Sequence, residues 1–223
     1  TCLSEMSKSE KTVPAIVEFV DIAGLVKGAS EGEGLGNQFL TNIRETDAIA
    51  EVVRLFDDED IHHVHGDVDP LRDIEVINLE LVLADQEMAE KRLDRVERDA
   101  KGGEKDIIAE RDVLRKIVPI LNAGRAAREV ELTEKEKEVV KGFHLLTMKP
   151  ILYILNRKSG AVNIDAENGN RWREVKNFLD TLNAKYVFVD AGVENELNDV
   201  GDSERADFRR ELGVTSDGID DLI

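Results

Sequence analysis

The sequence predicts an α/β fold in which a mainly parallel sheet carries an inserted antiparallel hairpin of two long helices. Short apolar runs alternate with segments of helical periodicity, which is typical of strands and helices that follow one another along the chain. One central stretch has apolar residues at heptad spacing on both sides of a glycine pair. The 223 residues are 41% hydrophobic and 4% aromatic, which favours a folded chain with a polar helical section.

Four short runs rich in β-branched and aromatic residues are predicted to be buried strands. Each closes on a polar or glycine-containing turn, so the chemistry is expected where the strands end. The first of them leads directly into the sequence Asp21-Ile-Ala-Gly24, and four more glycines follow up to position 36. The predicted strands are residues 15–20, 48–56, 151–155 and 186–189.

Helical periodicity predicts four helices outside the central insertion. Thr133 with Glu136 three residues later has the pattern of a capping box, so a helix is expected to run from there to about Leu146. The other three are expected at residues 35–45, 172–182 and 204–212.

The insertion is predicted to be two helices joined at Gly102-Gly103, with Pro119 bending or shortening the second. Its apolar residues fall at heptad spacing, so the two arms should pack against each other. On this reading residues 1–70 form the first part of one α/β domain, 71–128 the coiled-coil insertion, and 129–223 the remainder of the domain. The apolar heptad positions are Ile74, Ile77, Leu81, Ala84, Met88, Ile107, Leu114, Ile117 and Leu121.

Charge and cysteine content limit the partners and the compartment. The net charge of −18 disfavours nucleic acid and anionic membrane at long range, and sequence-specific DNA recognition is not expected. No run reaches the roughly 18 apolar residues of a membrane span. Cys2 is the single cysteine, so an intrachain disulfide is excluded and a reducing, cytoplasmic setting is expected.

Three polar elements, each following a predicted strand, indicate a nucleotide site. Asp21-x-x-Gly24 can hold Mg²⁺ through water with its carboxylate and meet a terminal phosphate with the glycine N–H, although a lone Asp there is more often a turn former. Asn156 follows the third strand, where a switch protein reads a purine base. The small-residue sequence Asp190-Ala191-Gly192 follows the fourth and is expected to form a loop against that base.

A longer string resembles a known family. VEFVDIAGLVKGAS at residues 17–30, GEGLGNQFL at 32–40 and NIRETD at 42–47 closely resemble the Obg-like ATPase (YchF) family, and Asp69-Pro70 with the hairpin resembles its coiled-coil insertion. The resemblance implies a P-loop NTPase-like fold, Mg²⁺-dependent hydrolysis of ATP in preference to GTP, and association with ribosomes. It implies nucleotide contacts for Asp21, Gly24, Asn156, Arg157, Ser159, Asp190, Ala191 and Gly192.

No catalytic residue follows from the resemblance. Leu25 stands where many GTPases have a catalytic glutamine, and a leucine cannot polarise water, so hydrolysis needs another group, a bound cation or a partner.

Three departures from the family pattern bear on activity. The chain contains no G-x-x-x-x-G-K-[ST] phosphate cradle, and no counterpart of the family's small β-rich C-terminal TGS domain. The base-reading loop is Asn156-Arg157-Lys158-Ser159, whereas the family has Asn-x-x-Glu, so the preference for ATP is open. We therefore expect a truncated chain that is weakly active or inactive.

A non-catalytic function stays open beside the ATPase. The α/β body could be a scaffold and the hairpin a recognition arm for ribosome or RNA, and the absent phosphate cradle fits that alternative. The hairpin's arginines could meet ribosomal RNA phosphates, yet the interleaved acids make ion pairs along the helices equally plausible. The arginines in question are Arg92, Arg95, Arg98, Arg111 and Arg115.

For the histidine cluster and the single tryptophan, we prefer a structural interpretation to a functional one. His62, His63 and His65 could suggest a metal site, but histidines exposed at a strand end are the ordinary explanation. Trp172 could stack on a base, but on an amphipathic helix it is expected to be a packing residue.

Overall fold

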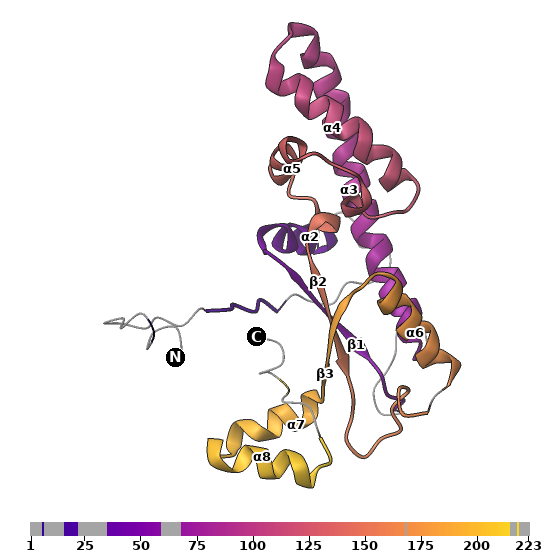
Figure 1. Cartoon of the computed structure of the whole chain (residues 1–223), viewed down its shortest axis with the longest axis vertical. Coiled ribbons are helices and arrows are strands. Elements are labelled where there is room, and N and C mark those ends of the chain that lie inside the picture. Colours follow the sequence, from indigo (N-terminus) through magenta and orange to yellow (C-terminus); the bar gives the residue numbers. More distant parts are fainter. Residues whose placement is uncertain are drawn as a thin grey trace.

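The computed structural model describes residues 6, 16–21, 35–58, 68–167, 169–214 and 218. Its centre is a sheet of strands β1 (Ile49–Arg54), β2 (Ile151–Asn156) and β3 (Lys185–Val189), in the order β1-β2-β3 (Figure 1). Both pairings are parallel, with Arg54 opposite Asn156 and Asn156 opposite Val189. The three strands end at one edge, as the alternating pattern of the sequence predicts.

One face of the sheet packs against helices α3 (Pro70–Asp99) and α6 (Asn170–Thr181). Alternate residues of a strand point to the same face, so Val53, Tyr153 and Leu155 lie together in a core with α6 residues Val175 and Leu179. The side chain of Trp172 packs beside this core, with its ring centroid 6.0 Å from that of Phe188, so the expectation of a packing role is confirmed.

The central insertion is an antiparallel hairpin of α3 and α4 (Lys105–Asn122). Asp69 caps α3 by accepting a hydrogen bond from the Arg72 N–H at 3.1 Å, and Pro70 occupies the first turn, where a missing N–H costs nothing. The short 3₁₀ helix η1 (Ala100–Gly102) and Gly103, with φ of 82°, turn the chain. Figure 1 shows the hairpin projecting beyond the sheet as an arm.

The two helices of the arm pack against each other as predicted, but through only part of the predicted heptad set. Ile74, Leu81 and Ala84 of α3 are buried in other clusters, and Val82, Ala89 and Val96 pack with the α4 residues instead. Val113, Leu114, Ile117 and Leu121 are buried in a cluster that includes α3 and the segment after α4. Pro119 does not end the helix, which continues to Asn122. The helix therefore tolerates the proline in its last turn, close to where its hydrogen bonds end.

Three shorter elements adjoin the base of the arm. They are η2 (Ala127–Glu129), α5 (Glu134–Lys141) and η3 (Leu146–Met148). The predicted capping box of α5 is present, with the Thr133 hydroxyl accepting from the Glu136 N–H at 3.4 Å. The helix ends at Lys141, however, and the expected extension to Leu146 is wrong. Gly142 forms the C-cap and His144 has φ of 52°, which a continuing helix cannot contain.

The remaining helices are α2 (Leu35–Glu45), α7 (Ala191–Glu196), the 3₁₀ helix η4 (Leu197–Asp199) and α8 (Asp202–Glu211). The predicted helices at 35–45 and 204–212 are thus confirmed within two residues. In Figure 1, α7 and α8 lie at the end of the sheet away from the arm.

The predicted strand at residues 15–20 is not formed by the part that is described. Residues 16–20 are irregular, and the side chains of Ile16, Val17, Phe19 and Val20 are exposed. A strand is stable when a neighbour satisfies its backbone groups, and in the described ranges the ladder partner of β1 is β2. Figure 1 shows this segment running away from the sheet. The apolar run alone was therefore insufficient to predict a paired strand.

No helix in the described ranges is long and apolar enough to cross a membrane. The histidines at positions 62, 63 and 65 lie outside the described residues.

Candidate functional site

The ends of β2 and β3 bring two of the predicted elements together. Asn156 is the last residue of β2 and pairs in register with Val189, the last residue of β3. Asp190 and Ala191 follow Val189 directly, so they lie beside Asn156 at the carboxyl edge of the sheet. This edge is where open α/β sheets place ligands.

The side chain of Asn156 is oriented by the start of α7. Its Oδ1 accepts a hydrogen bond from the backbone N–H of Ala191 at 3.1 Å. A planar amide whose oxygen is held in this way directs its Nδ2 to the opposite side, where it can donate to an acceptor atom on a ligand.

Asp190 joins the loop after β2 to the start of α7 at this edge. Its Oδ2 accepts the Ser159 N–H at 2.6 Å, and its Oδ1 accepts the Val193 N–H at 3.1 Å. The residue is 6% exposed, so these bonds form largely out of water. Asp190 is the N-cap of α7, and the expectation that residues 190–192 form a loop is therefore wrong, because Ala191 and Gly192 are the first turn of that helix.

Gly192 has a steric reason for lacking a side chain. A Cβ at this position would lie 3.3 Å from Asp190 Oδ1, which is tighter than ordinary van der Waals contact. The small residue keeps the cap geometry undisturbed.

Arg157 is held by the sheet and by two side chains. Its N–H donates to the Val189 carbonyl at 2.8 Å, so this group is engaged in the sheet edge and cannot also meet a base. The guanidinium lies 3.6 Å from the centroid of the Phe188 ring and forms an ion pair with Asp165. Arg157 therefore fastens its loop to β3.

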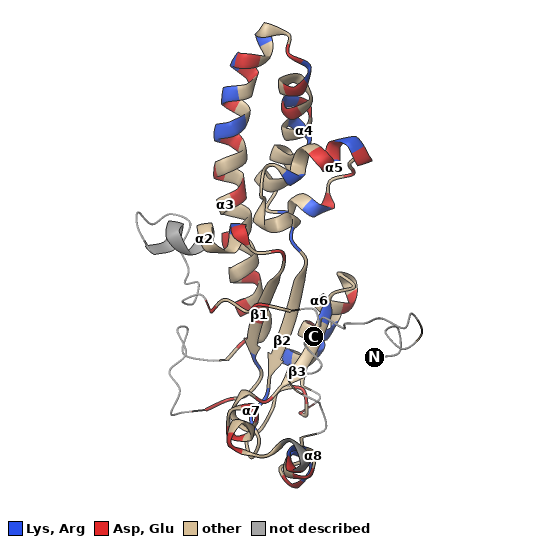
Figure 2. Cartoon of the chain, turned by 90° about the vertical axis from the view of Figure 1, so that its left-hand side faces the viewer, with Lys and Arg blue, Asp and Glu red and all other residues tan. Residues whose placement is uncertain are grey.

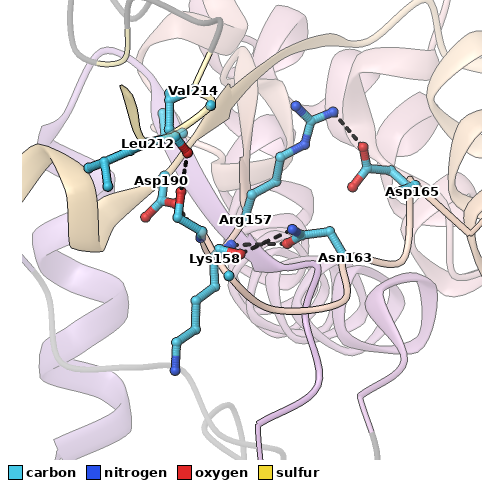
Figure 3. Close-up of a pocket in the computed structure, with 12 residues that line it drawn as sticks. Arg157, Lys158, Asn163, Asp165, Asp190, Leu212 and Val214 are labelled. Atoms are coloured by element: carbon cyan, nitrogen blue, oxygen red, sulfur yellow. Dashed lines mark hydrogen bonds and ion pairs between the residues drawn. The ribbon is translucent and has the colours of Figure 1, made fainter. Parts of the chain in front are cut away.

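A pocket of about 370 Å³ lies between this loop and the end of α8 (Figure 3). Three of the predicted residues line it, namely Arg157, Ser159 and Asp190, whereas Asn156, Ala191 and Gly192 lie outside its lining. The other lining residues are Lys158, Gly160, Asn163, Asp165, Ala166, Val189, Leu212, Gly213 and Val214.

Sequence reasoning missed Asn163, which shapes the Arg157–Ser159 loop. Its Oδ1 accepts the Lys158 N–H at 2.9 Å, and its Nδ2 donates to the Lys158 carbonyl at 3.1 Å. Figure 3 shows both bonds. The clue in the sequence was an asparagine shortly after a glycine turn, where its amide commonly bonds nearby backbone.

Comparison with known proteins identifies relatives of the chain. No protein-family model matches the chain. The chain is 46% identical over 221 residues to the ribosome-binding ATPase YchF of Bacillus subtilis, and 46% identical over 222 residues to the same protein of Escherichia coli O157:H7. Each alignment covers 99% of this chain. This chain belongs to the YchF family.

A solved structure supports the same assignment. The Schizosaccharomyces pombe YchF GTPase matches with a TM-score of 0.74 and 32% identity, over 96% of this chain and 58% of that one. The predicted P-loop NTPase-like α/β fold is thereby confirmed. The YchF-family chain spans about 60% of the length of the curated relatives it matches.

The residues predicted to sense phosphate are only partly described in this YchF-family chain. Asp21 is exposed, in the irregular segment that runs away from the sheet, and is not brought to the edge formed by Asn156 and Asp190. Gly24 and Leu25 lie outside the described residues.

Within the described part of the chain, the side chains do not form a cage for Mg²⁺. No group of three or more His, Cys, Asp or Glu side chains suited to a metal occurs in the described ranges. Mg²⁺ at nucleotide sites usually takes one or two carboxylates and completes its shell with water and substrate phosphates. A single carboxylate at Asp21 fits that pattern and not a dedicated protein site.

Proposed function

We propose that the chain is the part of a YchF-type switch ATPase that reads the nucleotide base and carries the helical arm. The proposed reaction is hydrolysis of ATP, or of GTP, with Mg²⁺, in a cytoplasmic protein that associates with ribosomes. The observation that carries the proposal is that the loop after β2 and the start of α7 are joined at one sheet edge, where Asn156 contacts Ala191 and Ser159 contacts Asp190. The relatives named ribosome-binding ATPases give the proposal its context.

Base recognition is assigned to Asn156, with Asp190 as its support. The Asn156 Oδ1 is occupied by Ala191, so the amide nitrogen is the group that meets the purine. Both carboxylate oxygens of Asp190 accept backbone N–H groups, and this acid therefore orients the loop after β2 and helix α7 rather than contacting the base. Ser159 has a hydroxyl where the family pattern Asn-x-x-Glu has a carboxylate. The preference of the site for ATP or GTP is therefore a quantity to be measured.

Phosphate chemistry is assigned to Asp21, Gly24 and a bound Mg²⁺. The ion would neutralise charge on the phosphates, and Asp21 would hold it through water. Leu25 cannot orient the attacking water, so the nucleophile needs a group from elsewhere.

The chain on its own is proposed to bind nucleotide weakly and to hydrolyse little. It contains no G-x-x-x-x-G-K-[ST] sequence, whose backbone N–H groups and lysine hold phosphates. Each charge-assisted contact of that kind contributes about 1.5–3 kcal/mol.

The arm is proposed to contact ribosomal RNA through arginines that its acids leave available. Arg92 pairs with Glu110 at 2.5 Å and Arg115 with Glu97 at 2.8 Å, so these side chains help to pack the arm. Arg95 and Arg98 are exposed on α3 and form no salt bridge with described residues. Figure 2 shows basic and acidic residues interleaved along the arm, which argues against a continuous basic face.

A non-catalytic scaffold that presents this arm is the second candidate, favoured by the length and solvent exposure of α3 and α4.

Pelleting with ribosomes separates the arm's contribution from that of the nucleotide site. Reversing both charges with Arg95→Glu and Arg98→Glu should reduce pelleting at least several-fold. The matched control is Arg111→Glu with Arg115→Glu, which changes the net charge equally at arginines paired with Asp112 at 2.6 Å and Glu97 at 2.8 Å.

The nucleotide assignment is tested by calorimetric titration of ATP and GTP with Mg²⁺. The titrated proteins are this chain, the chain extended upstream of Thr1 by a segment bearing G-x-x-x-x-G-K-[ST], and the extended chain with Asn156→Ala. Binding by the extended chain that weakens about tenfold in the variant supports the ATPase. Absence of binding to either nucleotide by the extended chain favours the scaffold.

A further inference from the structure

Asp85 is a fully buried acid at the base of the arm, far from the nucleotide site. It lies on α3 with 0% exposure and accepts four hydrogen bonds. The donors are Arg44 Nη1 at 3.0 Å, the N–H groups of Leu146 at 2.9 Å and Thr147 at 2.7 Å, and the Thr147 hydroxyl at 2.8 Å. Because every donor comes from another element, Asp85 joins three parts of the chain.

Arg44, in the last turn of α2, spreads its guanidinium over the same junction. Besides the Asp85 carboxylate it donates to the Ala84 carbonyl at 3.3 Å and to the His144 carbonyl at 3.0 Å. The arginine thereby contacts α3 and the segment before η3 with one rigid group.

Two further contacts close the junction. Lys149 Nζ donates to the Arg44 carbonyl at 3.0 Å and also to the Thr46 carbonyl, so the chain leaving α2 is held to the chain entering β2. Beneath these polar groups lies an apolar cluster formed by Leu40, Ile43, Leu81, Ala84 and Leu146. The cluster supplies the apolar contact area between α2 and α3, and the Arg44–Asp85 pair fixes how the two helices are positioned against each other.

The position of α2 in the chain places the junction between two predicted functional segments. The helix begins at Leu35, directly after the glycine-rich sequence from Gly24 to Gly34 that follows Asp21. The arm begins with α3, the helix that carries Asp85. A rigid connection between α2 and α3 therefore lies between the predicted phosphate-sensing sequence and the predicted ribosome-contacting arm.

We propose that Arg44 and Asp85 form a mechanical link that makes α2, the base of the arm and residues 144–149 move as one body, so that displacement of α2 is passed to the arm. The direction of that signal rests on the proposed nucleotide function, but the existence of the link does not. A buried ion pair with neutral donors on its remaining oxygens specifies one arrangement, and loss of either partner leaves a buried group uncompensated.

The test measures distances without nucleotide. In a Cys2→Ser background, spin labels at Asn42→Cys on α2 and Lys101→Cys at the arm's end report how α2 and the arm are held together. Labels at Lys101→Cys and Asn177→Cys on α6 report the arm against the sheet. Arg44→Gln breaks the Arg44–Asp85 ion pair at its partly exposed member. Asp94 is an exposed acid on α3, so Asp94→Asn is the matched control for Asp85→Asn.

We expect a narrow distribution of the 42–101 distance in the parent chain that broadens about twofold or more in Arg44→Gln and Asp85→Asn, with the 101–177 distance unchanged. Amide exchange of Leu146 and Thr147 should rise about tenfold in Asp85→Asn and stay unchanged in Asp94→Asn. An Arg44→Gln distribution as narrow as the parent's overturns the link, even if Asp85→Asn fails to fold. Since no nucleotide is present, a failed titration of the nucleotide site leaves this result unaffected.

Discussion

The Asp190 carboxylate accepts the backbone N–H of Ser159 at 2.6 Å, across 31 residues of sequence. The same carboxylate caps α7 through Val193. One buried acid therefore sets the spacing between the loop after β2 and the helix after β3, the two elements assigned to base recognition.

Replacing this acid should destabilise the fold measurably. Asp190→Ala removes an N-cap and a charge-assisted bond to Ser159, so the free energy of unfolding should fall by about 2 kcal/mol in urea titrations. Asp199→Ala, at an exposed position nearby, should change it by less than about 0.5 kcal/mol. Equal effects of the two substitutions would show that Asp190 does not hold the loop after β2 to α7.

Glu51 should make stability depend on pH. Burial of this β1 residue, and secondarily the charge of Asp73, raises its pKa from 4.5 to about 8, and its Oε2 has no hydrogen-bond partner among the described residues. Between these two values the folded state keeps a proton that the unfolded state has lost. Stability is therefore fully present below pH 4.5 and falls as the pH rises to about 8, by on the order of 1.4 kcal/mol per unit.

The variant Glu51→Gln should abolish that slope, because an amide carries no charge to bury. Urea unfolding at pH 5 and pH 8 should show a variant that is more stable than the parent at pH 8 and closely similar at pH 5. Glu131→Gln, an exposed control, should follow the parent at both values. A parent chain whose stability does not fall over this range would contradict a buried, protonated Glu51.

The packing of the arm predicts a large cost for a cavity between its helices. Leu114 is 0% exposed, so Leu114→Ala should reduce the free energy of unfolding by about 2–5 kcal/mol. Leu79→Ala is the matched control, since Leu79 on α3 is 49% exposed and should cost less than about 1 kcal/mol. Similar losses in both would mean that the two helices do not pack as described.

The capping box of α5 offers a finer test. Thr133→Ala removes the hydroxyl that accepts the Glu136 N–H and should cost about 1 kcal/mol. Thr133→Ser keeps a hydroxyl at that place and should recover most of the loss. If serine is no better than alanine in thermal unfolding, the cap contributes nothing to stability.

Local patterns were sufficient to predict most of the elements. The apolar runs that became β1, β2 and β3 lie between turn residues, and Thr133 with Glu136 located the start of α5. The run at 15–20 has the same composition but no paired neighbour among the described strands, and pairing cannot be read from one segment. The end of α5 depends on Gly142 at the C-cap and on His144 adopting a left-handed conformation, which histidine reaches more readily than most non-glycine residues but which the apolar pattern does not mark.

The contacts that define the site and the junction could not be predicted in this way. The order of Asn156 and Asp190 along the chain predicted two loops at one edge, but Ser159 and Asp190 meet only because β2 and β3 are neighbours. Arg44 and Asp85 are 41 residues apart, and each alone looks like a surface charge on a helix. Their pairing requires the three-dimensional packing of α2 on α3.

The most direct test of the central claim is a nuclear magnetic resonance titration of Mg²⁺-ATP into the chain extended by the phosphate-cradle segment, following individual amide signals. The account predicts saturable shifts for Ser159 and Ala191, with the amides of α4 unmoved. Saturable binding that leaves Ser159 and Ala191 unshifted would contradict it, because the base would then be read elsewhere.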